Sequence, residues 1–347
     1  MQETKKYDFL DGLRWLAILL VLLSHIHYTG FDIWDFFHIW LIGVPLFFMI
    51  SAYTLALSQD KKGIEKWRMK HFFLRRFFRI YPLYIVAIIA IFMLWYAGIV
   101  AERSNFNEWL FSRSNLLAHI TFTNGFSSAF MNSFRLGERS LFNEVCFYIL
   151  FVVVFPIVRS SVRNTLFFMC SAGVVYVVRN LVASRIWLDA TYIYHFPFYH
   201  LIDFLLGFLL FYIHKNYFQK HTLTTIQWTI LSVMVLILFL GLLWAYSQWF
   251  YINHLLRILS LFLISSCALL YLPLTKLLSS KILVYLGKVS YSLYLLNLPV
   301  LCMIGYYNPF SQYPIYNALL AWVMLVVISS LTYKYEEIGI ALGRRMS

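Results

Sequence analysis

The sequence predicts an all-α integral membrane protein with about ten transmembrane helices and with both termini in the cytoplasm. Its 347 residues are 61% hydrophobic and 20% aromatic but only 12% charged, and the mean hydropathy is +0.73. A soluble domain of this length does not have that balance. Apolar runs of about 17 to 23 residues, long enough to cross a ~30 Å hydrocarbon core, recur along the whole chain.

The ten predicted spans and the basic residues between them also set the orientation. The spans lie near residues 13–30, 36–58, 80–100, 140–158, 165–183, 198–214, 225–246, 254–273, 287–306 and 316–335. With the N-terminus inside, 20 Lys and Arg residues lie on the cytoplasmic side and seven lie outside, as membrane insertion favours. This asymmetry explains the net charge of +13 without a nucleic-acid partner.

The connecting segments indicate a single transmembrane domain over residues 1–347, with no appended soluble domain. The longest outer loop is at about 101–139, and its apolar middle is expected to lie at or dip into the membrane surface. The inner loop at about 58–79 is strongly basic. Four cysteines in apolar runs lack metal-ligand spacing, and the sequence contains no P-loop or dinucleotide fingerprint. We therefore expect no metal and no bound cofactor.

Two costly residues in the first span point to a function beyond anchoring. Arg14 and His25 are eleven positions apart, which places them on one helix face and roughly 16 Å apart along the axis. Ionisable groups inside a membrane usually face a protein interior or a functional site. Imidazole titrates near neutrality, so His25 is a candidate general base. The alternative is a histidine that only packs between helices.

A basic cluster at the inner start of the third span is a candidate phosphate site. Arg76 and Arg79 share a helix face, and Arg75 lies one turn before Arg79. Guanidinium groups bind phosphate oxygens well, which suggests docking of a phosphorylated cytosolic cofactor. Lipid headgroup binding explains the same cluster equally well.

Other polar residues in the spans complete the candidate site. Glu144 lies about one turn inside the fourth span, where a carboxylate could orient a histidine or pair with Arg139. His200 and Asp203, spaced i and i+3, either line an acceptor cavity or satisfy each other. Asn297 near mid-membrane is a hydrogen-bonding group on the acceptor side or an ordinary interhelical contact.

Taken together, five stretches resemble the acyltransferase 3 family of multi-spanning membrane O-acyltransferases. They are, in order, Leu10-Asp11-Gly12-Leu13-Arg14 with His25, Gly43-Val44-Pro45-Leu46-Phe47-Phe48-Met49-Ile50-Ser51, Arg75-Arg76-Phe77-Phe78-Arg79-Ile80-Tyr81-Pro82, Ser140-Leu141 to Glu144 with Phe147-Tyr148, and Gly287-Lys288-Val289-Ser290-Tyr291-Ser292-Leu293-Tyr294-Leu295. Each motif is weak alone, but their order and spacing cover nearly the whole chain.

The resemblance implies an acyl-CoA donor, usually acetyl-CoA, and transfer to a hydroxyl of a saccharide acceptor such as a cell-surface polysaccharide, an O-antigen or a lipid-linked glycan. By position, Arg14 and His25 match the family's arginine-x10-histidine pair, and Arg76 and Arg79 match its arginine-x-x-arginine motif. Glu144 matches the acidic residue before the Phe-Tyr pair. We expect the chain in the bacterial cytoplasmic (inner) membrane, among its lipids.

This chain departs from the family pattern at three positions. Arg139, Ala52 and Asn297 stand where the family often has tryptophan, glycine and histidine, respectively. Because His25 is present, we expect activity to survive the change at Asn297.

The expected mechanism places the CoA phosphates on the inner arginines and passes the pantetheine arm along the first helix beside Arg14. His25, oriented by Glu144, would then activate a sugar hydroxyl that enters from outside. Direct transfer and an acetyl-histidine intermediate both fit. Two other functions stay open: a transporter or flippase for a lipid-linked glycan, and an acyltransferase for a glycosylated small molecule.

Overall fold

The structure, a computed structural model, describes residues 7–31, 43–60, 69–98, 112–131, 133–134, 137–158, 197–218 and 273–345, together with scattered residues between 161 and 174. The predicted spans at 225–246 and 254–273 lie outside the described residues, and the span at 165–183 lies largely outside them. The ten-span count and the inward orientation of the termini therefore stay predictions.

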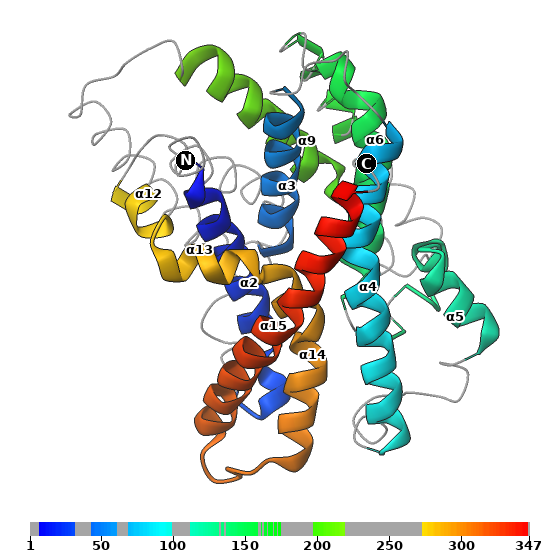
Figure 1. Cartoon of the computed structure of the whole chain (residues 1–347), viewed down its shortest axis with the longest axis vertical. Coiled ribbons are helices and arrows are strands. Elements are labelled where there is room, and N and C mark those ends of the chain that lie inside the picture. Colours follow the sequence, from blue (N-terminus) through cyan, green and yellow to red (C-terminus); the bar gives the residue numbers. More distant parts are fainter. Residues whose placement is uncertain are drawn as a thin grey trace.

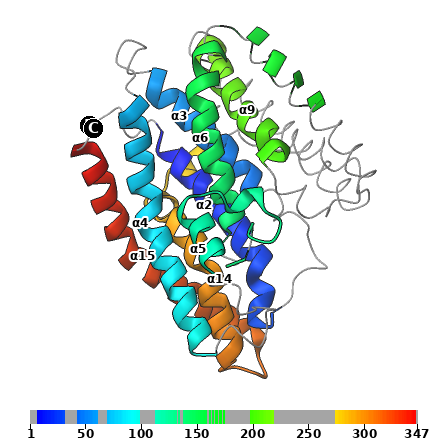
Figure 2. The same ribbon diagram turned by 90° about the vertical axis from the view of Figure 1, so that its right-hand side faces the viewer.

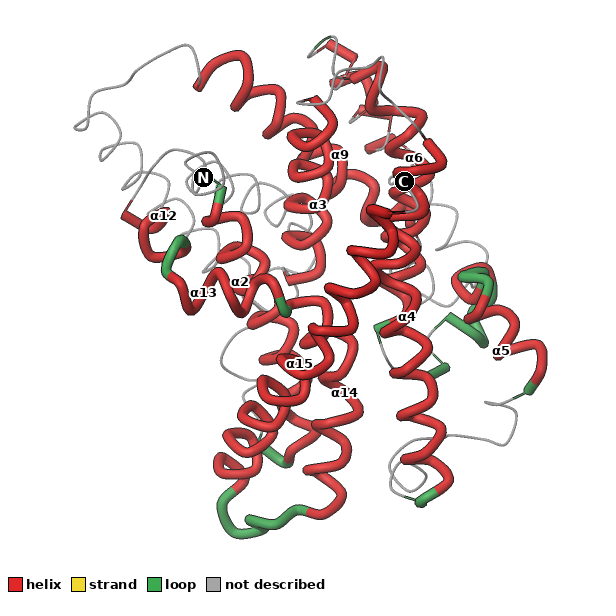
Figure 3. Tube along the Cα trace, in the orientation of Figure 1, coloured by secondary structure: helices red, strands yellow, loops and turns green. Residues whose placement is uncertain are grey.

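The described part is helical throughout, which confirms the all-α class (Figure 3). Its main helices are α2 (Asp8–His25), α3 (Gly43–Asp60), α4 (Met69–Tyr96), α6 (Glu138–Val158), α9 (Pro197–Ile213), α14 (Ser290–Tyr307) and α15 (Pro314–Arg345). Shorter segments are η1 (Ile26–Thr29), α5 (Arg113–Ile120), η4 (Asn124–Phe126), η5 (His214–Phe218), α12 (Pro273–Leu278) and α13 (Lys281–Lys288).

The helices form an antiparallel bundle (Figures 1 and 2). Helices α2, α4 and α14 run in one direction and α3, α6, α9 and α15 run in the other, as alternating spans do. Within the described residues, four helices are long and apolar enough to cross a membrane, or up to five if the bent pair α13 and α14 counts as one span. The chain is therefore a multi-pass membrane protein.

Helix α2 lies at the centre of the bundle and packs against α3, α12, α13 and α14. Glycines allow these helices to approach closely. A Cβ atom on Gly12 would collide with the backbone of Leu278, and one on Gly287 would collide with the backbone of Asp11. Because backbone cannot yield as a side chain does, these contacts fix α12 and α13 across the start of α2.

The span predicted at 287–306 differs from the structure at its inner end. Helices α13 and α14 meet at Val289 with a bend of 68°, so α14 begins only at Ser290. Because of the bend, α13 packs against α2 and α14 then changes direction while it also contacts α2. A hydropathy window does not detect this bend, because the residues on both sides of it are mostly apolar. The close tertiary contact at Gly287 accompanies the bend.

The described portion of the predicted outer loop packs between α4 and α6. Phe122 stacks on Tyr84 of α4 with ring centroids 5.1 Å apart, and Phe126 meets Phe142 of α6 edge-on at 5.0 Å. A buried polar network holds this segment, in which Ser133 hydrogen-bonds to Asn115 and His119 lies 3.8 Å from Glu138.

Candidate active site

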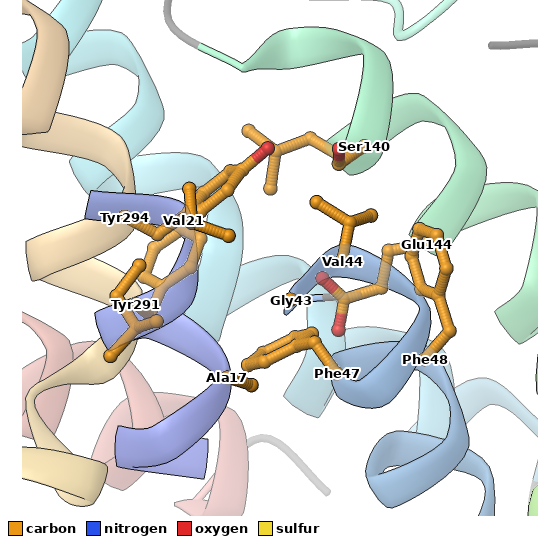
Figure 4. A pocket seen from close by; sticks show the side chains of 12 residues that line it. Ala17, Val21, Gly43, Val44, Phe47, Phe48, Ser140, Glu144, Tyr291 and Tyr294 are labelled. Atoms are coloured by element: carbon orange, nitrogen blue, oxygen red, sulfur yellow. The ribbon is translucent and has the colours of Figure 1, made fainter. Parts of the chain in front are cut away.

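A small pocket with a cavity volume of about 30 Å³ lies between α2, α3, α6 and α14 (Figure 4). Its wall is mainly apolar, and the carboxylate of Glu144 points into it from α6. The lining residues are Ala17, Ile18, Val21, Gly43, Val44, Phe47, Phe48, Ser140, Leu141, Glu144, Tyr291 and Tyr294.

The position of the pocket on α2 links the two residues that the sequence singled out. Ile18 and Val21 follow Arg14 by four and seven positions, and His25 follows it by eleven, so all four share one helix face. Both Ile18 and Val21 line the pocket. The pocket therefore lies between Arg14 and His25 along the α2 face that carries them.

At the N-terminal end of this α2 face, Arg14 is held by contacts with two side chains. Its Nη1 lies 2.5 Å from Oδ1 of Asp11, and its Nη2 donates a 3.2 Å hydrogen bond to Thr54 on α3. Arg14 thereby bridges α2 and α3 one helical turn before the pocket-lining residue Ile18.

The structure brings Arg76 and Arg79 of α4 to the same region. The guanidinium of Arg76 lies 5.4 Å from the ring centroid of Tyr148, and the Tyr148 hydroxyl donates a hydrogen bond to Glu144. Both α4 arginines interact electrostatically with Arg14 or with each other, and with Glu144 and Tyr148. Three arginines from two helices thus form one cluster at the Arg14 end of the pocket, which we call the arginine cluster.

Arg75, which the sequence grouped with the other two, is not among the groups that interact with Arg14, Arg76 or Arg79, and its role in donor binding stays a prediction. Its Cα faces Gly343 near the end of α15, at the contact between α4 and α15. We therefore assign the cluster to Arg14, Arg76 and Arg79.

At the C-terminal end of the same α2 face, His25 meets Asn297 of α14. Their side chains interact across the helix contact. Nδ1 of His25 and Oδ1 of Asn297 are both buried, and neither atom has a hydrogen-bond partner among the described residues. The Asn297 amide nitrogen donates a hydrogen bond to the Tyr294 carbonyl.

The expected contact between His25 and Glu144 is not among the described contacts. Glu144 accepts its hydrogen bond from Tyr148, which lies one turn further along the same helix. The groups that interact with His25 are Asn297, His27, Arg139 and the Tyr28 ring. Glu144 therefore belongs to the pocket wall, and Asn297 is the residue placed to orient His25.

His200 and Asp203 adopt the simpler of their two expected arrangements. His200 Nδ1 and Asp203 Oδ2 are 3.0 Å apart, and both side chains are buried. The His200 ring packs 5.3 Å from Phe48, which lines the pocket, while His200 itself does not. The pair therefore packs behind Phe48 and does not face the pocket itself.

Sequence reasoning missed a buried carboxylate next to the arginine cluster. Glu336 of α15 is 3% exposed, accepts a 2.6 Å hydrogen bond from Ser292 and interacts electrostatically with Arg79. Glu336 lies one residue beyond the span predicted at 316–335, where an acidic residue is usually interpreted as the polar end of a helix. Arg79 lies one residue before the span predicted at 80–100, so the two residues are expected at a similar membrane depth, and this match could have predicted their interaction.

Comparison with known proteins identifies the family. The acyltransferase domain of acyltransferase 3 proteins matches residues 7–333 of this chain. The chain belongs to the acyltransferase 3 family. It is 27% identical over 354 residues to a Staphylococcus aureus (strain COL) protein provisionally named an O-acetyltransferase, and 25% identical over 356 residues to the O-acetyltransferase OatA of S. aureus (strain NCTC 8325).

Each of these alignments covers 94% of this chain but only 56% of the relative, so the chain spans about half the length of the relatives it matches. No solved structure matches the chain. The family match places residues 7–333 among acyltransferase domains.

The buried position of Glu336 predicts a strong difference from its neighbour. Glu336→Ala should remove several kcal/mol of stability, on the order of 3–5 kcal/mol, because it leaves Arg79 without this counter-charge. Glu337→Ala, at an exposed position on the same turn, should change stability by less than about 0.5 kcal/mol. Thermal unfolding of both variants in detergent measures the difference. Equal melting temperatures would show that Glu336 does not balance the cluster.

Proposed function

We propose that this chain is an acyl-CoA-dependent O-acetyltransferase of the bacterial cytoplasmic membrane that acetylates a saccharide hydroxyl. The observation that carries the proposal is the pocket between the arginine cluster and His25 on one face of α2. A cationic inner end suits a donor with phosphates, an apolar middle suits a thioester arm, and an imidazole at the outer end suits activation of a hydroxyl.

The arginine cluster would bind the donor phosphates from the cytosolic side. Arg76 and Arg79 have planar guanidinium groups whose N–H donors match phosphate oxygens. Arg14 lies at the start of the α2 face that carries His25 at its other end. The pantetheine arm would then extend along Ile18 and Val21. In this arrangement Glu144 would accept a hydrogen bond from an amide N–H of the arm.

His25 would act as the general base in the transfer step. Its Nε2 takes the proton from the acceptor hydroxyl while the hydroxyl oxygen attacks the thioester carbonyl carbon. The tetrahedral intermediate collapses with cleavage of the carbon–sulfur bond, and the CoA thiolate leaves with the proton from His25. The Asn297 side chain, which interacts with His25, would help to stabilise the imidazolium that forms, as a carboxylate or carbonyl does in other histidine bases.

An enzyme is better supported than a flippase for two reasons. The relatives that this chain matches over 94% of its length are named as O-acetyltransferases. The described polar groups also separate into the arginine cluster, which would bind the donor phosphates, and the His25 imidazole, which would activate the acceptor, as a group transfer requires.

The role of His25 predicts a selective loss of activity. His25→Ala should lower acetyl transfer by about 10²–10⁴-fold while the protein still inserts and accumulates, because a general base contributes that much. His27→Ala is the matched control, since His27 lies two residues away with Nδ1 bonded to the Ser24 carbonyl. Mass spectrometry of surface glycans from cells with each variant measures O-acetylation. Normal acetylation with His25→Ala would refute the base assignment.

The role of the arginine cluster predicts a loss of donor affinity that depends on the donor phosphates. The double variant Arg76→Ala/Arg79→Ala should raise the KM for acetyl-CoA by at least about tenfold, because each charge-assisted hydrogen bond contributes about 1.5–3 kcal/mol. The KM for S-acetyl-pantetheine, which lacks the phosphates, should stay unchanged.

Lys334→Ala, at an exposed position on α15, controls for loss of a general positive field. Steady-state kinetics of each purified protein in nanodiscs gives the KM for acetyl-CoA and the KM for S-acetyl-pantetheine. An equal rise for both donors, or none for acetyl-CoA, would exclude these arginines from phosphate binding.

A further inference from the structure

The turn between α14 and α15 carries a dense group of exposed aromatic rings. Five aromatic side chains within residues 306–316 are between 39% and 63% exposed, and they are Tyr306, Tyr307, Phe310, Tyr313 and Tyr316. We call this group the aromatic turn. Residues 306–317 include no charged side chain, but Asn308, Ser311 and Gln312 are exposed between the rings.

The aromatic turn is held in a defined shape by one buried side chain. Asn317 donates a 2.6 Å hydrogen bond to Oδ1 of Asn308 and accepts a 3.1 Å hydrogen bond from the Phe310 backbone N–H. Asn308 adopts a left-handed conformation with φ of 43°, which ends α14. A surface fixed in this way loses little entropy when a ligand binds.

The rings themselves are arranged so that they support one another. Tyr316 makes edge-to-face contacts with Phe310 at 5.9 Å and with Tyr313 at 5.7 Å. In such pairs the face of a ring stays available beside its neighbour's edge. Exposed ring faces next to amides and hydroxyls are what a pyranose needs, because a sugar has an apolar C–H face and a rim of hydroxyl groups.

The aromatic turn lies at the His25 end of the bundle. Figure 1 shows the α14–α15 hairpin beside the end of α2, and both helices contact η1. Tyr28 is three residues after His25. It packs on a hydrophobic cluster of α14 and α15 next to the aromatic turn, formed by Leu301, Ile304 and Ala321. A ligand on the aromatic turn would therefore approach His25 from the side opposite the arginine cluster.

We propose that the aromatic turn is a docking site for the saccharide acceptor, which stacks sugar units on its rings while another unit of the same chain reaches His25. This inference rests on the proposed function and names a second contact for its acceptor. Tyrosines also occur at membrane interfaces as anchors. Tyr96 at the end of α4 is 80% exposed and has the position of such an anchor, and its described chain neighbours, residues 93–98, include no side-chain amide.

The test compares the double variant Tyr313→Ala/Tyr316→Ala with wild type and with Tyr96→Ala, all purified in nanodiscs. The acceptor probe is surface polysaccharide from the source cells after alkaline removal of ester groups. We expect the KM for this polysaccharide to rise by about tenfold or more in the double variant, with the KM for acetyl-CoA unchanged. Tyr313→Trp/Tyr316→Trp should restore the polysaccharide KM, and Tyr96→Ala should leave it at the wild-type value.

A binding measurement separates this proposal from the proposed function. In the His25→Ala background, thermophoresis should show polysaccharide binding that the double variant weakens by a similar factor, whether or not transfer occurs. Unchanged polysaccharide affinity in the double variant would overturn the docking site. A fall in melting temperature with unchanged affinity would identify the aromatic turn as a membrane anchor instead.

Discussion

The backbone contact between Gly287 and Asp11 determines where the first helix lies, and the rest of the site depends on it. Without a Cβ atom, Gly287 lets α13 lie directly on α2. The same stretch of α2 holds Arg14 through Asp11, and the bend after α13 directs α14 along α2. Tyr291, Tyr294 and Asn297 of α14 consequently face the pocket and His25. Two motifs that are far apart in the sequence form one structural unit.

Buried charge is the second constraint. Arg14, Arg76 and Arg79 are expensive to remove from water, and their interactions with Asp11, Glu144 and Glu336 offset part of that cost. The aromatic rings of Phe72 and Tyr148 cover the Arg76 guanidinium. A site built in this way keeps positive charge available for an anion while the helices remain packed. This arrangement explains why carboxylates from three different helices surround a site proposed to bind phosphates.

The sequence predicted those features that follow from membrane physics alone. The all-α class and the importance of Arg14 and His25 follow from hydropathy and from the cost of ionisable groups in a bilayer. The shared face of Arg14 and His25 follows from helix geometry, and the pocket lies along it. Glu144 lines the pocket and accepts a hydrogen bond from Tyr148 at i+4 on the same helix, while its pairing with His25 stays a prediction.

The features that sequence reasoning missed depend on contacts between distant helices. The pairing of His25 with Asn297, the separation of Arg75 from the arginine cluster and the approach of Glu336 to Arg79 each require a particular helix rotation. Hydrophobic periodicity sets that rotation poorly in α14 and α15, which are apolar on several faces. The bend at Val289 coincides with the close packing at Gly287, and no proline marks it.

The central claim is that an acyl group passes along α2 from one membrane face to the other. Sealed proteoliposomes test it directly, with radiolabelled acetyl-CoA added only outside and de-O-acetylated surface polysaccharide trapped only inside. Label should appear on the trapped polysaccharide at a rate proportional to the amount of protein. Transfer that occurs only when donor and polysaccharide share one side of the membrane would contradict the account.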